Sequence, residues 1–246
     1  MPKDWKGDIV FSGSVAIFRG HVAENKAHGH WASQITIALD GELAFETSAG
    51  LHRSKAAYFA SKTTHRLLSG FVCSIYFDPL SESILKSLNK DAQDGWLALS
   101  HEDLPPPLGS ITASTDLREL LNSGALDAVD LAASQDDRFK AVIAEIKAKL
   151  KEGDDVDRDS LAAIANLSPT RFSHWFVERT GVPVRSYKKW FKLRVAMDAL
   201  LNATPPGEAA MMAGFSDLAH MSRAFSESFG LTYLDALRAL QQSNRL

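Results

Sequence analysis

Apolar positions in the N-terminal third of the chain follow the pattern of short β-strands. They alternate or run together over a few residues and are interrupted by Asp40-Gly41, Ala49-Gly50 and Ser69-Gly70, dipeptides that favour turns. The predicted strands are 15–18, 34–39, 43–47, 57–60 and 72–77. Several short strands at this spacing indicate a small barrel or sandwich. We therefore predict a β domain over residues 1–80.

The apolar period becomes helical after residue 80. Pro105 to Pro107 exclude a helix locally, because proline lacks the backbone N–H that a helix interior needs. Leucines on either side of residue 120 predict a short helical hairpin, and a spacing of three and four predicts an amphipathic helix near residues 139–150. These apolar residues are Leu117, Leu120, Leu121, Leu126, Phe139, Val142, Ile143, Ile146 and Leu150. A domain boundary is expected between residues 123 and 134.

Two similar segments, 168–181 and 217–230, follow in the C-terminal third. Each begins with a residue that caps helix N-termini (Ser168, Asp217), has apolar positions four apart, and ends at a glycine. Each also follows a short alanine-rich stretch and a tight turn. A supporting helix, a turn and a second helix make a helix-turn-helix, so the repeat predicts two such units and binding to double-stranded DNA.

Burial of the apolar side of each second helix turns its polar side toward DNA. In the first unit we expect Phe172, Trp175 and Phe176 to be buried. The residues predicted to contact DNA are Thr170, Ser173, His174, Arg179, Lys188, Lys189, Ala219, His220, Ser222 and Arg223. Arginine contacts guanine through two hydrogen bonds, which makes Arg223 the leading candidate for base recognition. Arg179 and the two lysines are expected to contact phosphates, and plain solvent exposure is the alternative for the small side chains.

The segment between the two units contains neither glycine nor proline from residue 184 to 202. Taken as one helix, it would be about 28 Å long. Successive major grooves on one face of B-DNA are about 34 Å apart. A rigid helix of this length suits the placement of two recognition helices in neighbouring grooves, so one chain would recognise a site without two-fold symmetry.

The net charge of −3 is unevenly distributed. Between residues 166 and 194, seven lysines and arginines are opposed only by Glu178, and such a patch can meet a phosphate backbone; a solvated helix face is the alternative. Cys73 is the only cysteine, which excludes an intrachain disulfide and a cysteine zinc site and suits a reducing cytoplasm. The start of the chain lacks the pattern of a signal peptide, and no apolar run reaches the length of a membrane span. We expect a cytoplasmic protein with no membrane partner.

The C-terminal residues resemble the AraC/XylS family of bacterial transcription regulators. The resemblance covers roughly residues 136–237 and rests on Leu161-Ala162, Ser168, Phe172, Phe176, Gly181, Arg194-Val195-Ala196, Leu200-Leu201, Gly214-Phe215, Arg223-Ala224-Phe225 and Gly230-Leu231-Thr232. It implies a seven-helix DNA-binding domain that controls transcription, often behind an N-terminal domain that binds a small-molecule effector.

The N-terminal domain carries a histidine pattern that is similar to the cupin motifs. His28-Gly29-His30, followed by Gln34 and Gly41, resembles the first motif, and His65 stands where the second supplies its ligand. Imidazoles and an amide suit iron, nickel, zinc or manganese. We predict His28, His30, Gln34 and His65 as ligands of a divalent metal. The alternative is a barrel that keeps the histidines without metal and binds an organic effector.

The sequence as a whole therefore predicts an α+β protein of two domains. A cupin-like β-barrel (1–80) is joined by a helical connector (81–134) to an all-α domain with tandem helix-turn-helix units (135–246). We expect a sequence-specific transcription regulator rather than an enzyme. Ligand or metal binding would shift the connector, whose leucines would form a homodimer surface; local packing of these leucines is the alternative. A metal-dependent cupin enzyme with a DNA-binding appendage is the competing function, whereas a single cysteine argues against a bifunctional alkylation-repair regulator.

Overall fold

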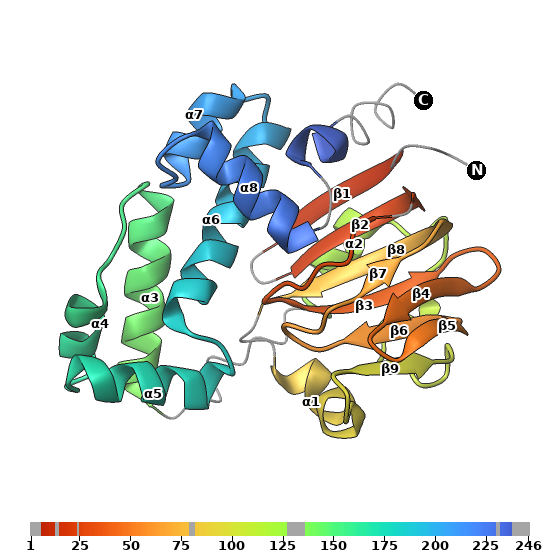
Figure 1. Cartoon of the computed structure of the whole chain (residues 1–246), viewed down its shortest axis with the longest axis horizontal. Coiled ribbons are helices and arrows are strands. Elements are labelled where there is room, and N and C mark those ends of the chain that lie inside the picture. The colour runs from red at the N-terminus through yellow and green to blue at the C-terminus, as the bar shows by residue number, and fades with distance from the viewer. Residues whose placement is uncertain are drawn as a thin grey trace. The chain divides into compact units, whose positions relative to one another are not determined.

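The computed structural model describes residues 6–12, 15–23, 25–78, 82–126, 136–229 and 232–237. The chain divides into two compact units, one made of residues 1–129 and 226–246 and the other of residues 130–225. Strands dominate the first unit and helices the second (Figure 1). The α+β architecture predicted from the sequence is thereby confirmed. The predicted domain bounds, 1–80, 81–134 and 135–246, stay predictions.

The N-terminal unit contains two antiparallel sheets. Its strands are β1 (Lys6–Ser12), β2 (Val15–Val22), β3 (Ser33–Ala38), β4 (Leu43–Thr47), β5 (Gly50–Ser54), β6 (Ala56–Phe59), β7 (Arg66–Leu67), β8 (Gly70–Phe77) and β9 (Trp96–Leu99). The larger sheet has the order β1-β2-β8-β3-β6-β9, and the smaller has the order β5-β4-β7. Among the described residues the two sheets share no strand, so the predicted barrel is more accurately a sandwich of open sheets.

Strand β3 shows how this unit separates an apolar face from a polar one. It lies between β8 and β6, and Gln34 is paired with Tyr76 on one side and Phe59 on the other. Every position of β3 is buried because both faces of the sheet are covered. Side chains alternate along a strand, so Ile35 and Ile37 enter the apolar core while Gln34 and Thr36 point to the opposite face.

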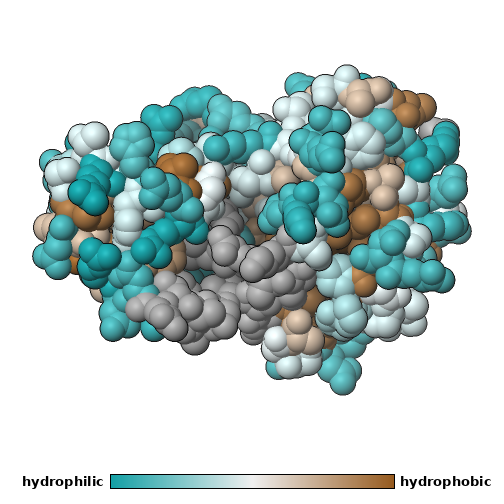
Figure 2. Space-filling model, turned by 90° about the horizontal axis from the view of Figure 1, so that it is seen from below, coloured by the Kyte–Doolittle hydropathy of each residue, from teal (hydrophilic) through white to brown (hydrophobic). Residues whose placement is uncertain are grey.

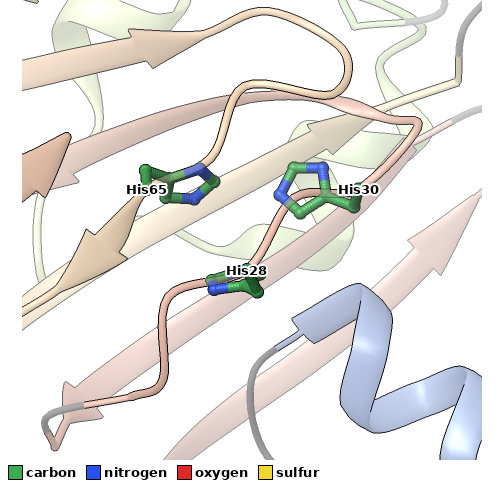
Figure 3. Close-up of side chains that lie close together, drawn as sticks. All are labelled: His28, His30 and His65. Carbon is green, nitrogen blue, oxygen red and sulfur yellow. The ribbon is translucent and has the colours of Figure 1, made fainter. Parts of the chain in front are cut away.

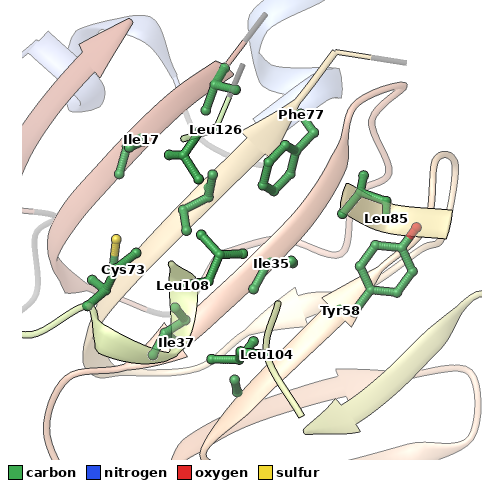
Figure 4. Packing of buried hydrophobic residues seen from close by; sticks show 14 of the residues in the cluster. Ile17, Ile35, Ile37, Tyr58, Cys73, Phe77, Leu85, Leu104, Leu108 and Leu126 are labelled. Carbon is green, nitrogen blue, oxygen red and sulfur yellow. The ribbon is translucent and has the colours of Figure 1, made fainter. Parts of the chain in front are cut away.

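The segment after β8 covers the apolar face of the large sheet. It contains α1 (Glu82–Asp91), β9, a short 3-10 helix at Leu108–Ser110 and α2 (Leu117–Asn122). Leu85, Leu104, Leu108 and Leu126 pack there against strand residues (Figure 4). The Arg19 guanidinium fastens the segment to β2 by donating to the carbonyl oxygen of Ala113 at 3.0 Å.

This segment was expected to be a helical connector with leucines available for self-association. Instead, β9 pairs with β6, and Leu117, Leu121 and Leu126 are buried in the core of the N-terminal unit. The leucine spacing of an interface helix and that of a helix covering a sheet are alike, because both bury one face. The described leucines are therefore used in local packing, which was the alternative.

The C-terminal part is helical throughout its described elements. They are α3 (Asp137–Lys151), α4 (Arg158–Ile164), α5 (Pro169–Thr180), α6 (Val184–Leu201), α7 (Pro206–Met212) and α8 (Leu218–Phe229), and residues 233–237 are helical as well. The amphipathic helix predicted near residues 139–150 is α3, with all five apolar positions buried. Helix α6 is unbroken, as expected from its lack of glycine and proline, and its 18 residues are about 27 Å long.

Local sequence determines where the two recognition-type helices begin and end. Ser168 caps α5 by accepting from the backbone N–H of Arg171, and Pro169 occupies the first turn, where its missing N–H is not needed. Gly181 ends α5 in the left-handed region, with φ of 69°. Asp217 precedes α8 and accepts from the N–H of His220 at 2.6 Å. Both N-termini are thus defined by capping side chains.

The described surface is mainly polar. On the face drawn in Figure 2, hydrophilic residues predominate and apolar ones occur in small groups. Large apolar side chains that are exposed include Leu51, Met211 and Met212. Among the described residues, no helix has both the length and the apolar character needed to cross a bilayer.

Candidate functional site

The first recognition-type helix, α5, buries its aromatic side and exposes polar side chains. Phe172 and Phe176 are fully buried, whereas Thr170 and His174 are exposed. Ser173 is half-buried, and its hydroxyl donates to the carbonyl oxygen of Pro169 at 3.0 Å. Thr170 and His174 therefore face solvent, as the sequence predicted for their orientation.

Trp175 and Arg179 belong to a cluster at the other end of α5. Trp175 is half-buried rather than buried as expected, and the guanidinium of Arg179 lies 4.9 Å from the centre of its ring. Arg179 also pairs with Asp136 at 2.7 Å. Hydrogen bonding from Arg138, and then the charges of Arg138 and Arg179, lower the pKa of Asp136. A phosphate would compete with this carboxylate for Arg179.

Two lysines one turn apart on α6 are held inside the helical unit. Lys188 Nζ donates to Asp155 Oδ1 and to the carbonyl oxygen of Val156, both at 2.7 Å. Lys192 Nζ lies 3.3 Å from Asp155 Oδ2 and 2.9 Å from the carbonyl oxygen of Gly214. Both side chains are about 15% exposed. This network, Asp155 with Lys188 and Lys192, joins the α3–α4 loop, α6 and the turn before α8.

The network gives Lys188 a partner other than the phosphate that was predicted for it. Lys189, predicted for the same role, is half-buried. The role of Lys192 was missed because its partners are far away in the sequence, and the run of basic residues did not show which acidic residue would lie beside it. Burial alone would raise the pKa of Asp155, but the hydrogen bonds and charges of Lys188 and Lys192 outweigh this desolvation and lower the pKa overall.

The second recognition-type helix, α8, presents most of its predicted residues to solvent. Ala219, His220 and Arg223 are exposed, and Ser222 is half-buried. The ring of His220 packs edge-on against Phe215, with Nδ1 3.1 Å from Ser216 Oγ. The backbone N–H of His220, more than any charge, lowers the pKa of Asp217. Arg223 thus projects from a helix whose start is fixed by a cap.

The structure brings the predicted histidines together in the N-terminal unit. His28, His30 and His65 are buried, and one ring nitrogen from each lies within 4.8 Å of the others (Figure 3). His28 and His65 exchange backbone hydrogen bonds of 3.0 and 2.9 Å in an isolated bridge. His28 and His30 precede β3 in an irregular segment, and their rings converge.

Backbone carbonyls orient the imidazole rings. His30 Nδ1 lies 2.6 Å from the carbonyl oxygen of Ala32, and His65 Nδ1 lies 2.9 Å from that of Thr63. His28 Nδ1 lies 3.1 Å from the carbonyl oxygen of Lys26. A carbonyl only accepts hydrogen bonds, so Nδ1 carries the hydrogen and Nε2 of a neutral ring presents a lone pair. Desolvation by burial lowers the pKa of all three rings, that of His28 to about 3, which keeps them neutral.

Gln34 completes the cluster. Its Oε1 lies 2.7 Å from His30 Nε2 and 3.0 Å from His65 Nε2, and its Nε2 donates to Thr36 Oγ1 at 2.7 Å. A neutral ring with its hydrogen on Nδ1 cannot donate from Nε2 to Gln34 Oε1. The lone pairs of the two Nε2 atoms and of Oε1 therefore face one another. A divalent cation bound by the imidazoles and the amide oxygen resolves this arrangement, and so does a rotated amide whose NH₂ faces the rings. Three nitrogens and one oxygen form a donor set that fits a transition metal or zinc.

Aromatic residues surround the cluster, which we call the histidine centre (His28, His30, His65 and Gln34). Phe59 stacks on His65 with ring centroids 4.0 Å apart, and Tyr76 packs edge-on against His30 at 5.3 Å. Phe45 and Phe59 are fully buried, whereas Trp31 is half-buried with Lys62 over its ring. Apolar walls limit access of water and hold the rings in place.

Comparisons with known proteins locate the family resemblance in the C-terminal part. Residues 161–239 match the family model described as a helix-turn-helix domain. No curated protein matches the chain. The fold is similar to a crystal structure of an apo ToxT variant from Vibrio cholerae, with a TM-score of 0.59, 12% identity, and coverage of 93% of this chain and 98% of that one.

Two further solved structures were found. Unsaturated-fatty-acid-bound ToxT from Vibrio cholerae gives a TM-score of 0.58 and 12% identity, and 94% of this chain and 97% of that one are covered. A transcriptional regulator with an AraC-type DNA-binding domain, from Chromobacterium violaceum, gives 0.40 and 19%, over 45% of this chain and 97% of that one. The likeness to ToxT shows a shared two-domain fold.

Proposed function

We propose, on the premise that residues 161–239 form an AraC-type helix-turn-helix domain, that this protein is an effector-controlled transcription regulator. In this proposal α5 and α8 recognise neighbouring major grooves of a promoter or operator. The DNA contacts are the side chains exposed on those helices, above all His174 and Arg223. DNA as the target would place the protein in the cytoplasm.

The observation that carries this proposal is the pair of equivalent helices. Each is capped at its N-terminus and exposes polar residues in its first turns, where helix-turn-helix proteins contact base edges. Helix α6, about 27 Å long, separates them in the chain and has no break. Two recognition helices in one chain favour a DNA site without two-fold symmetry. Such a site would be about one turn of DNA longer than a site that a single helix contacts.

Selection of random duplex DNA by the full-length protein tests the function. We expect an enriched sequence with two short conserved segments about 10 base pairs apart, centre to centre. Arg223→Ala should relax the preference within one segment only, since each helix contacts its own groove. Absence of any enriched sequence would refute the proposal.

We further propose that the histidine centre binds a divalent metal, as part of the effector-binding function of the N-terminal unit. The convergence of neutral imidazoles on Gln34 Oε1 supports this. A bound metal would supply a Lewis-acidic attachment point for an oxygen-containing small molecule. ToxT is known in a fatty-acid-bound form, and an organic effector without metal is the alternative for this chain.

Metal analysis of the purified full-length protein tests the centre. We expect about one equivalent of metal, lost in His30→Ala and His65→Ala but kept in His21→Ala, a histidine outside the centre. Metal-free wild-type protein that also fails to take up Zn²⁺ or Ni²⁺ would refute the metal. Catalytic turnover that disappears in His30→Ala would favour the competing function, a cupin enzyme with a DNA-binding domain.

A further inference from the structure

A chain of buried polar groups leads away from the histidine centre. Gln34 and Thr36 on β3 and Ser74 and Tyr76 on β8 share one face of the large sheet, with Gln34 opposite Tyr76 and Thr36 opposite Ser74. Gln34, Thr36 and Ser74 are fully buried, and Tyr76 is nearly so. Buried polar side chains in the middle of a sheet are costly unless every one is hydrogen-bonded.

Hydrogen bonds join the first three of these groups. Gln34 Nε2 donates to Thr36 Oγ1 at 2.7 Å, and Thr36 Oγ1 lies 3.0 Å from Ser74 Oγ, where either hydroxyl could be the donor. The Tyr76 side chain comes next, two residues along the same face of β8, and the Ser74 side chain acts on its pKa. Burial raises the pKa of Tyr76, so its hydroxyl keeps its hydrogen. We call Thr36, Ser74 and Tyr76 the hydroxyl relay.

A hydroxyl both donates and accepts, so the relay has two self-consistent directions. In the outward direction the Gln34 amide donates to Thr36, Thr36 donates to Ser74, and Ser74 donates to the Tyr76 oxygen. Gln34 Oε1 then faces the imidazoles with its lone pairs. This direction suits a metal, because every group facing the centre is an electron-pair donor.

The inward direction reverses each bond. Tyr76 donates to Ser74, Ser74 donates to Thr36, and Thr36 donates to the Gln34 oxygen after the amide has rotated. The amide NH₂ then offers one hydrogen each to the Nε2 atoms of His30 and His65. All these groups are satisfied without a metal, so the same residues can form a stable metal-free centre.

We propose that the hydroxyl relay is the positioning element of the histidine centre, and that metal binding reverses its direction. This rests on the proposed metal. In the metal-bound form Ser74 donates to Tyr76, which leaves the Tyr76 hydrogen for another acceptor, such as a carboxylate or carbonyl of a bound effector. In the metal-free form the Tyr76 hydrogen is used within the relay. Tyr76 thereby reports metal occupancy to an oxygen-containing ligand.

The two directions respond differently to loss of a hydroxyl. In Thr36→Val the outward direction leaves a buried amide N–H without an acceptor, whereas the inward direction leaves only an oxygen lone pair without a donor. An orphaned buried donor is the more costly defect, since an oxygen keeps other partners. Thr36→Val should therefore weaken metal binding by about tenfold or more. Thr36→Ser keeps the hydroxyl and should stay within about threefold of wild type.

The experiment measures Zn²⁺ affinity of the full-length protein by competition with a chromophoric chelator. Thr36→Val is compared with Thr36→Ser, alone and combined with Gln34→Glu, and thermal melting checks that each variant folds. A carboxylate carries no N–H to orient, so the Thr36→Val effect should shrink to less than about threefold when combined with Gln34→Glu. A merely structural role of Thr36 would weaken binding equally in both backgrounds. Should Thr36→Val not fold, Tyr76→Phe replaces it, with at least about fivefold weaker binding expected.

The outcomes separate the two proposals. If wild-type protein binds no Zn²⁺, the metal proposal fails and the relay fails with it. If wild type binds Zn²⁺ and Thr36→Val or Tyr76→Phe binds it equally tightly, the relay alone is overturned. If Thr36→Val weakens Zn²⁺ binding in protein that has Gln34 but not in the Gln34→Glu variant, the relay is supported. Only an amide needs the relay to turn its oxygen toward the metal.

Discussion

Arg223 is the residue on which base recognition by α8 is expected to depend. It is exposed, and the carboxylate of Asp217, which precedes α8, is engaged by the backbone N–H of His220 more than by the charge of Arg223. Arg223→Ala should reduce the difference between the binding free energies for operator and random DNA by about 1–3 kcal/mol. Parallel titrations of both DNAs at one salt concentration measure this. Arg223→Lys is the matched control: it keeps the charge but cannot make the two parallel bonds, so it should lose specificity while keeping affinity for random DNA.

Lys188 is expected to contribute less to phosphate binding than Arg185, another basic residue of α6. Its ammonium group is held by Asp155 and a backbone carbonyl, so it has little freedom to neutralise a phosphate. Lys188→Met should lower the stability of the helical unit by about 1 kcal/mol and leave the slope of log K against log salt almost unchanged. Arg185, exposed on the same helix, is the comparison: Arg185→Met should reduce that slope by about one. If Lys188→Met makes the slope of log K against log salt less steep, Lys188 contacts a phosphate after all.

The sequence showed the chemistry of individual residues better than their partners. The histidine centre was predicted from four positions, because a motif states which residue types must converge. The pairing of Lys188 and Lys192 with Asp155 was not predicted, because contacts between residues more than thirty positions apart depend on how helices pack. Charge runs alone do not say which opposite charge will be the neighbour.

At the scale of elements, the turn before α8 depends on glycines that approach each other closely. Gly214 has φ of 73°, and a methyl group there would lie 3.1 Å from the carbonyl oxygen of Gly153. Gly181 has a similar φ of 69° at the end of α5, but a methyl group there would meet nothing within 4 Å. These two glycines share the left-handed backbone conformation and differ in the crowding around them.

This pair gives a matched prediction. Gly181→Ala should destabilise the protein by about 1 kcal/mol, the cost of a side chain in the left-handed region. Gly214→Ala should cost about 1–2 kcal/mol more, because the α3–α4 loop must also move away. Chemical denaturation followed by circular dichroism measures both. If Gly181→Ala and Gly214→Ala lower the stability equally, the close approach of Gly153 to Gly214 does not disfavour a methyl group at position 214.

Strands and helices were predicted unequally well, for a physical reason. The central strand β3 was found because its isoleucines alternate with polar residues, and β8 was found because it is apolar over most of its length. Strand β5, mostly exposed, and β9, inside a segment with helical leucine spacing, were missed because an edge strand needs few apolar residues. Helices α5 and α8 were found through their caps, which are local signals.

At the scale of the whole molecule, control of transcription requires that the N-terminal centre and the DNA-binding surface be energetically linked. The two compact units are formed by different parts of the chain, so the linkage is expressed as a coupling free energy between them. Linkage is reciprocal: if metal changes operator affinity by some factor, operator DNA must change metal affinity by the same factor. Agreement of the two factors is a more stringent test of linkage than a change in either affinity alone.

We expect a coupling factor of about 5–150, the usual range for allosteric proteins. Operator affinity is measured for the full-length protein with Zn²⁺ bound and after its removal, and Zn²⁺ affinity is measured with and without operator. The two ratios should agree. His30→Ala should give a single operator affinity regardless of Zn²⁺, because the centre that distinguishes the two states is lost. Ratios of one for the wild type would mean that the centre stabilises its own unit without controlling DNA binding, and control would then require a different ligand.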